Sequence, residues 1–206
     1  MKYQDLRIKF KDFSVFSLAD IRKADTAFYR PRLSEWQEKG YIKKLRRGYY
    51  IFADTLLNEE FLFLIANKLY VPSYVSLEMA LSYYDLIPEG VYSITSISSK
   101  KTASFKTPIA VFSYRKIKAK LLFGYRLEKQ KGQGYKIADM EKAVLDYLYF
   151  NHNIVNEADF YEWRFNSKEF LAKANIKKLY KYAGTFNNKY FSKRLEKLMA
   201  LMKKSK

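Results

Sequence analysis

The sequence predicts an α+β fold from three features. Residues 3–39 carry helix-start signals and apolar residues at helical spacing. β-branched and aromatic residues gather in short runs within residues 41–52 and 91–138, as is typical of strands. Residues 157–203 then show a helical pattern throughout, in pieces separated by Asn- and Gly-containing breaks.

The chain is long enough for two small domains. It has 206 residues, of which 49% are apolar, so a packed core is expected. No stretch rich in Pro, Gly or Ser divides it, and we place a soft boundary after residue 53. Residues 1–53 are predicted to form one domain and 54–206 a second, with a mixed α/β core at 54–150 and a basic helical region at 151–206.

The first domain is predicted to start with three helices. Residues 3–13 fit a helix that packs behind a helix pair. The pair begins at Ser17, which forms a capping box with Asp20. Phe16 and Ile21 occupy the two positions that staple such a helix start.

The second helix of the pair is predicted to begin at Pro31, because proline lacks the N–H that a first helical turn leaves unused. Leu33 and Trp36 lie three residues apart and therefore share a face, which we expect to be buried. Gly40 is expected to end the helix in a left-handed conformation.

A basic β-hairpin is predicted next, with strands at residues 41–45 and 49–52 and a glycine in its loop. Helix, turn, helix and hairpin in this order predict a winged helix-turn-helix, whose second helix enters the major groove of DNA. Cations flank that helix and crowd the hairpin tip, where phosphates would neutralise them. A helix pair and hairpin without a ligand is the alternative. The candidate DNA-binding residues are Arg30, Arg32, Ser34, Glu35, Lys43, Lys44, Arg46 and Arg47.

The second domain is predicted to alternate between helices and strands. Asn58 caps a helix that ends before Pro72-Ser73. The remaining elements up to residue 150 are a helix at 76–84, strands at 91–99, 102–107, 109–115, 121–129 and 135–138, and a long helix from Asp139 to Phe150. Lys100-Lys101 is predicted to make a turn after the strand at 91–99, from which the strand at 102–107 returns.

The net charge of +18 points to a polyanion as partner. Residues 1–53 and 151–206 carry +7 and +8, whereas 54–150 carry +3. An acidic membrane surface is the rival partner, but the basic stretches lack an amphipathic anchoring helix. No signal peptide or membrane-spanning run is visible, so we expect a cytoplasmic protein without membrane contact.

The C-terminal helices repeat cations every three or four residues. An ordinary solvated helix face is one interpretation, and a second phosphate-binding surface is the other. The candidate secondary phosphate contacts are Lys177, Lys178, Lys181, Lys193 and Arg194.

Catalytic residues are scarce. The chain has no Cys and a single His, which excludes thiolate chemistry and Cys-based zinc sites. Asp139, Glu141 and Asp146 are the densest acidic group, and helix capping explains them better than metal binding. We therefore expect no enzyme, metal or cofactor. A Mg²⁺-dependent nuclease built on these three acids is the alternative function, and an RNA-binding module is a third.

The sequence resembles the AbiEi-type antitoxins of bacterial abortive-infection toxin–antitoxin operons over most of its first 150 residues. Met140 departs from the family pattern, in which proline precedes Glu-Lys-Ala. The matching motifs are Leu33-Ser-Glu-Trp36, Gly40-Tyr-Ile, Arg47-Gly-Tyr-Tyr-Ile-Phe52, residues 74–89, Ile94-Thr-Ser96, Phe123-Gly124 and residues 137–146.

The resemblance implies a winged-helix domain followed by a larger mixed antitoxin domain. It also implies repression of the protein's own operon at inverted repeats in double-stranded DNA. The implied toxin is similar to a nucleotidyltransferase and is antagonised without a stable toxin–antitoxin complex. The residues themselves predict only a basic, cytoplasmic DNA-binding protein.

Overall fold

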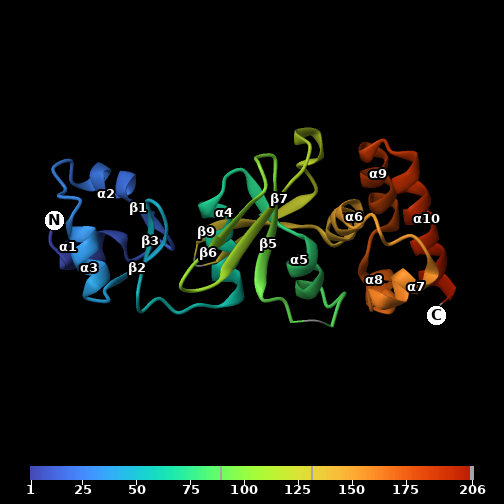
Figure 1. Ribbon diagram of the computed structural model, residues 1–206, viewed down its shortest axis with the longest axis horizontal. Helices are drawn as coiled ribbons and strands as arrows, with labels where there is room; N and C mark the ends of the chain where they lie inside the picture. Colours follow the sequence, from blue (N-terminus) through green and yellow to red (C-terminus); the bar gives the residue numbers. More distant parts are fainter. Residues whose placement is uncertain (89, 131, 205–206) are drawn as a thin grey trace.

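Two β-sheets and the helices around them make up the part of the chain that the computed structural model describes, residues 1–88, 90–130 and 132–204 (Figure 1). The predicted α+β class is confirmed. The blue N-terminal elements, the green and yellow larger sheet, and the orange and red C-terminal helices follow one another along the long axis. Glu89, which closes the motif at residues 74–89, lies outside the described residues.

The N-terminal unit, as we call α1 to β3, carries a three-stranded antiparallel sheet in the order β1-β3-β2. Its hairpin and helix pair lie within one or two residues of their predicted positions. The elements are α1 (Tyr3–Phe10), β1 (Phe16–Ser17), α2 (Leu18–Ala24), α3 (Arg32–Glu38), β2 (Ile42–Arg46) and β3 (Tyr49–Phe52).

Local sequence signals explain how this unit folds. The Ser17 hydroxyl accepts a hydrogen bond from the Asp20 amide at 3.2 Å, and the Asp20 carboxylate accepts one from the Ser17 amide at 2.9 Å, so the capping box is confirmed. The stapling pair Phe16 and Ile21 is fully buried. Gly40 has φ +69° and ends α3 in the predicted left-handed conformation.

The second unit, as we call α4 to α10, is built on a six-stranded mixed sheet in the order β6-β7-β5-β4-β9-β8. Helix α4 packs on one face, where Tyr114 of β7 donates to the Ala66 carbonyl. Helices α5 and α6 pack on the opposite face. The elements up to α6 are α4 (Glu59–Leu69), β4 (Ser73–Val75), α5 (Leu77–Tyr83), β5 (Ser93–Ser98), β6 (Ala103–Lys106), β7 (Val111–Lys116), a 3₁₀ turn (Ala119–Leu121), β8 (Tyr125–Gln130), β9 (Gln133–Ala138) and α6 (Met140–Phe150).

Three features of this sheet differ from the prediction. A short strand, β4, lies at its centre, where the sequence predicted only a break. Strand β6 pairs with β7 and not with β5, because β7 runs parallel to β5 and lies between them. The run at 121–129 becomes a strand only at Tyr125, after Gly124 with φ +73°.

Helices complete the C-terminal part, as predicted. Asn156, Asn166 and Asn175 cap three of them by accepting hydrogen bonds from backbone amides of the first turn. The four helices are α7 (Glu157–Glu162), α8 (Ser167–Lys173), α9 (Ile176–Phe186) and α10 (Lys189–Lys204).

The central strand of the three-stranded sheet, β3, is buried on both faces. Alternate residues of a strand point to opposite faces, so Tyr50 and Phe52 of β3 join the core formed with α1, α2 and α3. Ile51 between them, together with Leu45 and Val15, joins the core of the second unit. The cores of the two units therefore pack against opposite faces of this sheet.

A buried polar network fixes α6 against the larger sheet. Lys142 and Asp146 form an ion pair on α6 and are both fully buried. The Asp146 carboxylate also accepts hydrogen bonds from the Tyr74 hydroxyl at 2.8 Å and the Ser76 hydroxyl at 2.9 Å. Burial raises the pKa of Asp146, and the neighbouring Lys142 ammonium opposes that rise.

Replacing Lys142 by Met is expected to lower the free energy of unfolding by about 3–5 kcal/mol, because it leaves a buried carboxylate without its cation. The loss should shrink as the pH falls, since a protonated Asp146 needs no counter-charge. Urea unfolding at several pH values measures both effects. The exposed Lys120→Met variant should stay within about 0.5 kcal/mol of the wild type, and a Lys142→Met variant as stable as the wild type would contradict the role of the pair.

Candidate nucleic-acid interface

Helix α3 has one buried and one exposed face. Leu33 and Trp36 are buried in the N-terminal core, as predicted. Ser34 and Glu35 are exposed, and the Glu35 carboxylate pairs with Lys39 at 2.6 Å. This pairing lowers the pKa of Glu35. The outer face of α3 thus presents the Ser34 hydroxyl and an ionised Glu35 carboxylate whose charge is compensated by Lys39.

The two arginines at the start of α3 differ in their surroundings. Arg30 is exposed, and no hydrogen bond or ion pair engages it within the described chain. Burial raises the pKa of Tyr50 on β3, and the Arg30 charge opposes that rise. Arg32 is half-buried and donates to the Met1 carbonyl at 2.6 Å, so part of its donor set is already used.

The β2–β3 hairpin turns at Arg47-Gly48, where Gly48 has φ +83°. A register shift between Lys44 and Arg46 forms an irregularity in β2 just before the turn. Lys44 and Arg47 are exposed and Lys43 is half-buried. Among the described residues, no carboxylate lies within ion-pair distance of these three cations. They are available to a polyanion.

Arg46 is directed away from the hairpin tip and toward the second unit. Its guanidinium donates to the Leu69 carbonyl at the end of α4 at 2.7 Å. It also lies over the rings of Phe105 on β6, at 4.4 Å, and Tyr49, at 5.4 Å. Arg46 therefore ties the two units together, and we remove it from the set of candidate phosphate contacts.

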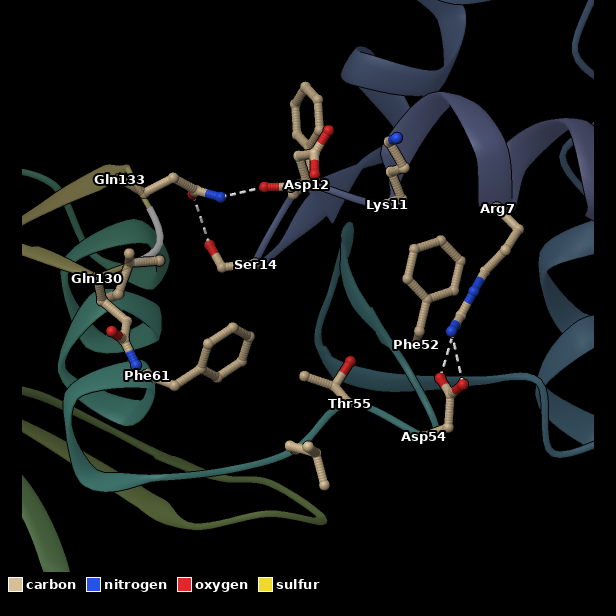
Figure 2. Close-up of a pocket in the computed structure, with 13 residues that line it drawn as sticks. Arg7, Lys11, Asp12, Ser14, Phe52, Asp54, Thr55, Phe61, Gln130 and Gln133 are labelled. Carbon is tan, nitrogen blue, oxygen red and sulfur yellow. Dashed lines mark hydrogen bonds and ion pairs between the residues drawn. The ribbon is translucent and has the colours of Figure 1, made fainter.

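A second tie crosses a cleft of about 360 Å³ between the units (Figure 2). The Gln133 side chain reaches from β9 to the loop after α1. Its amide nitrogen donates to the Asp12 carbonyl, and its oxygen accepts from the Ser14 hydroxyl at 2.9 Å. At the other side of the cleft, Arg7 and Asp54 form a bidentate ion pair, with both N–O distances at 2.6 Å.

The C-terminal cations are only partly exposed. Lys177, Lys181 and Lys193 are exposed. Lys178 pairs with two carboxylates on or next to α6, at 2.9 and 3.1 Å. Burial alone would lower the pKa of Lys178, but those two partners raise it. Arg194 is 2% exposed and donates to the Ile154 carbonyl at 2.7 Å, so the prediction of a phosphate contact there is wrong.

The three acids that suggested metal binding are all paired with lysines. Asp139 and Glu141 share Lys178, and Asp146 pairs with Lys142. Asp139 accepts from the Tyr182 hydroxyl at 2.9 Å and pairs with Lys178. Asp139 lies at the N-cap of α6, as the capping interpretation predicts, but its carboxylate makes no capping hydrogen bond. Glu141 accepts from the Asn175 amide at 2.7 Å, and Asp146 belongs to the buried network. Within the described residues, no group of three or more His, Cys, Asp or Glu side chains is placed to hold a metal ion.

Comparisons with models of protein families and with curated proteins give no match. None of the helices within the described ranges is long and apolar enough to cross a membrane.

Sequence reasoning missed the residues that hold the units together. Gln133 carries no recognisable signal, because a single glutamine between two glycines is ordinary in a sequence. Arg46 was grouped with Arg47, although Arg46 is the last residue of β2 and Arg47 lies in the turn. Two aromatic residues near Arg46 in space, Tyr49 and Phe105, are 56 residues apart in the chain.

The variant Arg46→Ala is expected to loosen the contact between the units. A hydrogen bond to a charged group contributes about 1.5–3 kcal/mol, so local opening should become at least about tenfold more frequent. Hydrogen exchange of peptides covering β2 and β6, followed by mass spectrometry, reports this opening. Arg47→Ala is the matched control and should leave the exchange unchanged. Equal exchange in Arg46→Ala and the wild type would show that the tie is unimportant.

Proposed function

We propose that this protein is a sequence-specific DNA-binding autorepressor and the antitoxin of a bacterial abortive-infection system, acting in the cytoplasm against a nucleotidyltransferase-like toxin. The observation that carries the DNA-binding part is the grouping of exposed, unpaired cations around α3 and the β2–β3 hairpin. The antitoxin part rests on the sequence motifs shared with the AbiEi-type family.

The order of elements in the N-terminal unit supports a winged helix-turn-helix. A helix and a short strand precede the pair α2 and α3, and a two-stranded hairpin follows. In such a module α3 enters the major groove and the hairpin contacts the adjacent backbone or minor groove. The exposed Ser34 and Glu35 then face base edges or phosphates.

The distribution of free charge supports the same assignment. Arg30 before α3 is exposed and acts electrostatically on Tyr50 of β3, where its charge opposes the rise in pKa that burial causes. Lys44 and Arg47 extend this cationic surface along the hairpin. Phosphate contacts of this kind position a protein on the duplex, whereas contacts from α3 give the sequence preference.

The antitoxin motifs occupy the buried centre of the second unit. Residues 137–146 form the end of β9 and the first part of α6, including both Lys142 and Asp146. Residues 74–88 include Tyr74 and Ser76, which hydrogen-bond to the same Asp146. These two motifs thus meet in one network, which supports a common fold for the antitoxin domain.

Replacing Arg47 by Ala is expected to weaken binding to every DNA sequence alike. The slope of log K against log salt should fall in magnitude by about 0.9 for the lost phosphate contact. Anisotropy titrations between about 50 and 200 mM salt, with the DNA upstream of the protein's reading frame and a scrambled duplex, measure this.

Two control variants accompany the Arg47→Ala measurement. Arg46→Ala should leave the slope unchanged, because its guanidinium is engaged by the second unit. Lys120→Ala removes an exposed cation far from the hairpin in sequence and should also leave it unchanged. An Arg47→Ala slope equal to that of the wild type argues against the wing, and a preference for RNA over duplex DNA argues against the repressor.

Co-expression tests the antitoxin part separately. The gene next to this one is expected to encode a nucleotidyltransferase-like toxin whose induction stops growth, and this protein should restore growth. Arg47→Ala should still restore growth while repressing a promoter reporter less, because the two activities reside in different units. Absence of such a gene, or no rescue by the wild-type protein, would overturn the antitoxin assignment without affecting DNA binding.

A further inference from the structure

A groove of about 810 Å³ opens on the second unit, on the face of the larger sheet that α5 and α6 only partly cover. Strands β5, β7 and β6 form its floor. Thr95, Ser113 and Ser104 are register partners across these strands and therefore lie in one row on one face. The volume is within the range of pockets that bind small organic molecules.

One wall of the groove carries a buried donor without an acceptor. Trp163 stacks on Tyr147, with ring centroids 4.8 Å apart and an interplanar angle of 11°, and both residues line the groove. Trp163 is 7% exposed, and its indole Nε1 has no hydrogen-bond partner within the described structure. A buried N–H without an acceptor is destabilising, so a ligand with an acceptor oxygen would relieve it.

The cation of the groove is Arg115 on β7. Its guanidinium lies 4.6 Å from the centroid of the Phe150 ring. Among the described residues no carboxylate pairs with it. Glu78 and Glu162 also line the groove; Glu78 lies in the first turn of α5, where the helix dipole stabilises its charge, and Glu162 is exposed to water. The net charge of +18 adds a field that attracts anions.

The backbone beside the groove is strained. Leu77 lines it and has φ +59°, an unfavourable conformation for a residue with a branched side chain. The Thr95 hydroxyl holds this turn by donating to the Ser76 carbonyl at 2.7 Å and accepting from the Met79 amide at 3.0 Å. Strain of this kind persists where the surroundings enforce it, and it clusters at ligand sites.

We propose that this groove binds a small organic anion with a flat apolar body. The acidic group pairs with Arg115, and the body lies against Leu77, Ile87 and Val91 above the hydroxyl floor. The site is separate from the DNA-binding surface, and its existence does not depend on the proposed function.

Two dyes of nearly equal shape test the proposal. 1-Anilinonaphthalene-8-sulfonate carries a sulfonate, and N-phenyl-1-naphthylamine is the same ring system without it. The chain has two tryptophans, so in the Trp36→Phe variant all tryptophan emission comes from Trp163. We expect the anionic dye to quench this emission with one-to-one saturation, and the neutral dye to bind at least about tenfold more weakly, because it lacks the charge-assisted contact.

Variants locate the bound dye. Arg115→Gln should weaken the anionic dye at least about tenfold and leave the neutral dye unchanged. Ser113→Leu, which fills the floor, should weaken both, while Arg22→Gln on α2 should weaken neither. Circular dichroism of each variant confirms folding. Equal affinity for the two dyes, no saturable quenching of Trp163, or unchanged binding in both folded groove variants would overturn the proposal.

Discussion

The central strand β3 of the N-terminal sheet is the element on which the rest of the structure depends, because both of its faces are buried. Tyr50 and Phe52 face the helices of their own unit, while Ile51 faces the second unit. A slip of β3 by one residue would exchange these side chains between the two cores. The register of this one strand therefore sets both the packing of α3 and the orientation of the hairpin relative to the larger sheet.

Arg46 and β6 add a second contact between the two units, outside the three-stranded sheet. The Arg46 guanidinium lies over Phe105, and the Phe105 ring packs 5.6 Å from that of Tyr114 on β7. The residues just before Phe105, Ala103 and Ser104, line the groove of the second unit. One short strand thus contributes to both the groove and the support of the hairpin. The contact between Arg46 and the Phe105 ring thus connects β6 directly with the hairpin.

The sequence predicted those features that depend on neighbouring residues. The Ser17 capping box, the left-handed Gly40 and the buried pair of α3 were all correct, because each is decided within one or two turns of chain. The central strand β4 and the parallel pairing of β5 with β7 were not predicted. Three residues carry too weak a periodicity for a strand to be recognised, and pairing between distant segments leaves no local pattern.

For the candidate site, the sequence predicted where basic residues are concentrated, but not which of their side chains are exposed. Sequence places Arg46, Arg47 and Arg194 in basic stretches, but it does not say which side of an element each faces. In the structure Arg46 and Arg194 donate to backbone carbonyls, and only Arg47 remains exposed. The acids near Asp139 were ambiguous for the same reason, since their partner Lys178 is 39 residues away in the chain.

Buried cations change what the net charge of +18 means. Lys142 pairs with Asp146 inside the core, and Lys178 pairs with two carboxylates, so neither lysine adds an unpaired positive charge to the protein surface. What attracts a polyanion is the remaining exposed set, and around α3 and the hairpin it has no carboxylate partner in the described chain apart from the Glu35–Lys39 pair. Unpaired charges held together on a rigid hairpin repel one another. Binding of a ligand with the opposite charge, spaced like the phosphates of a duplex, would relieve this repulsion.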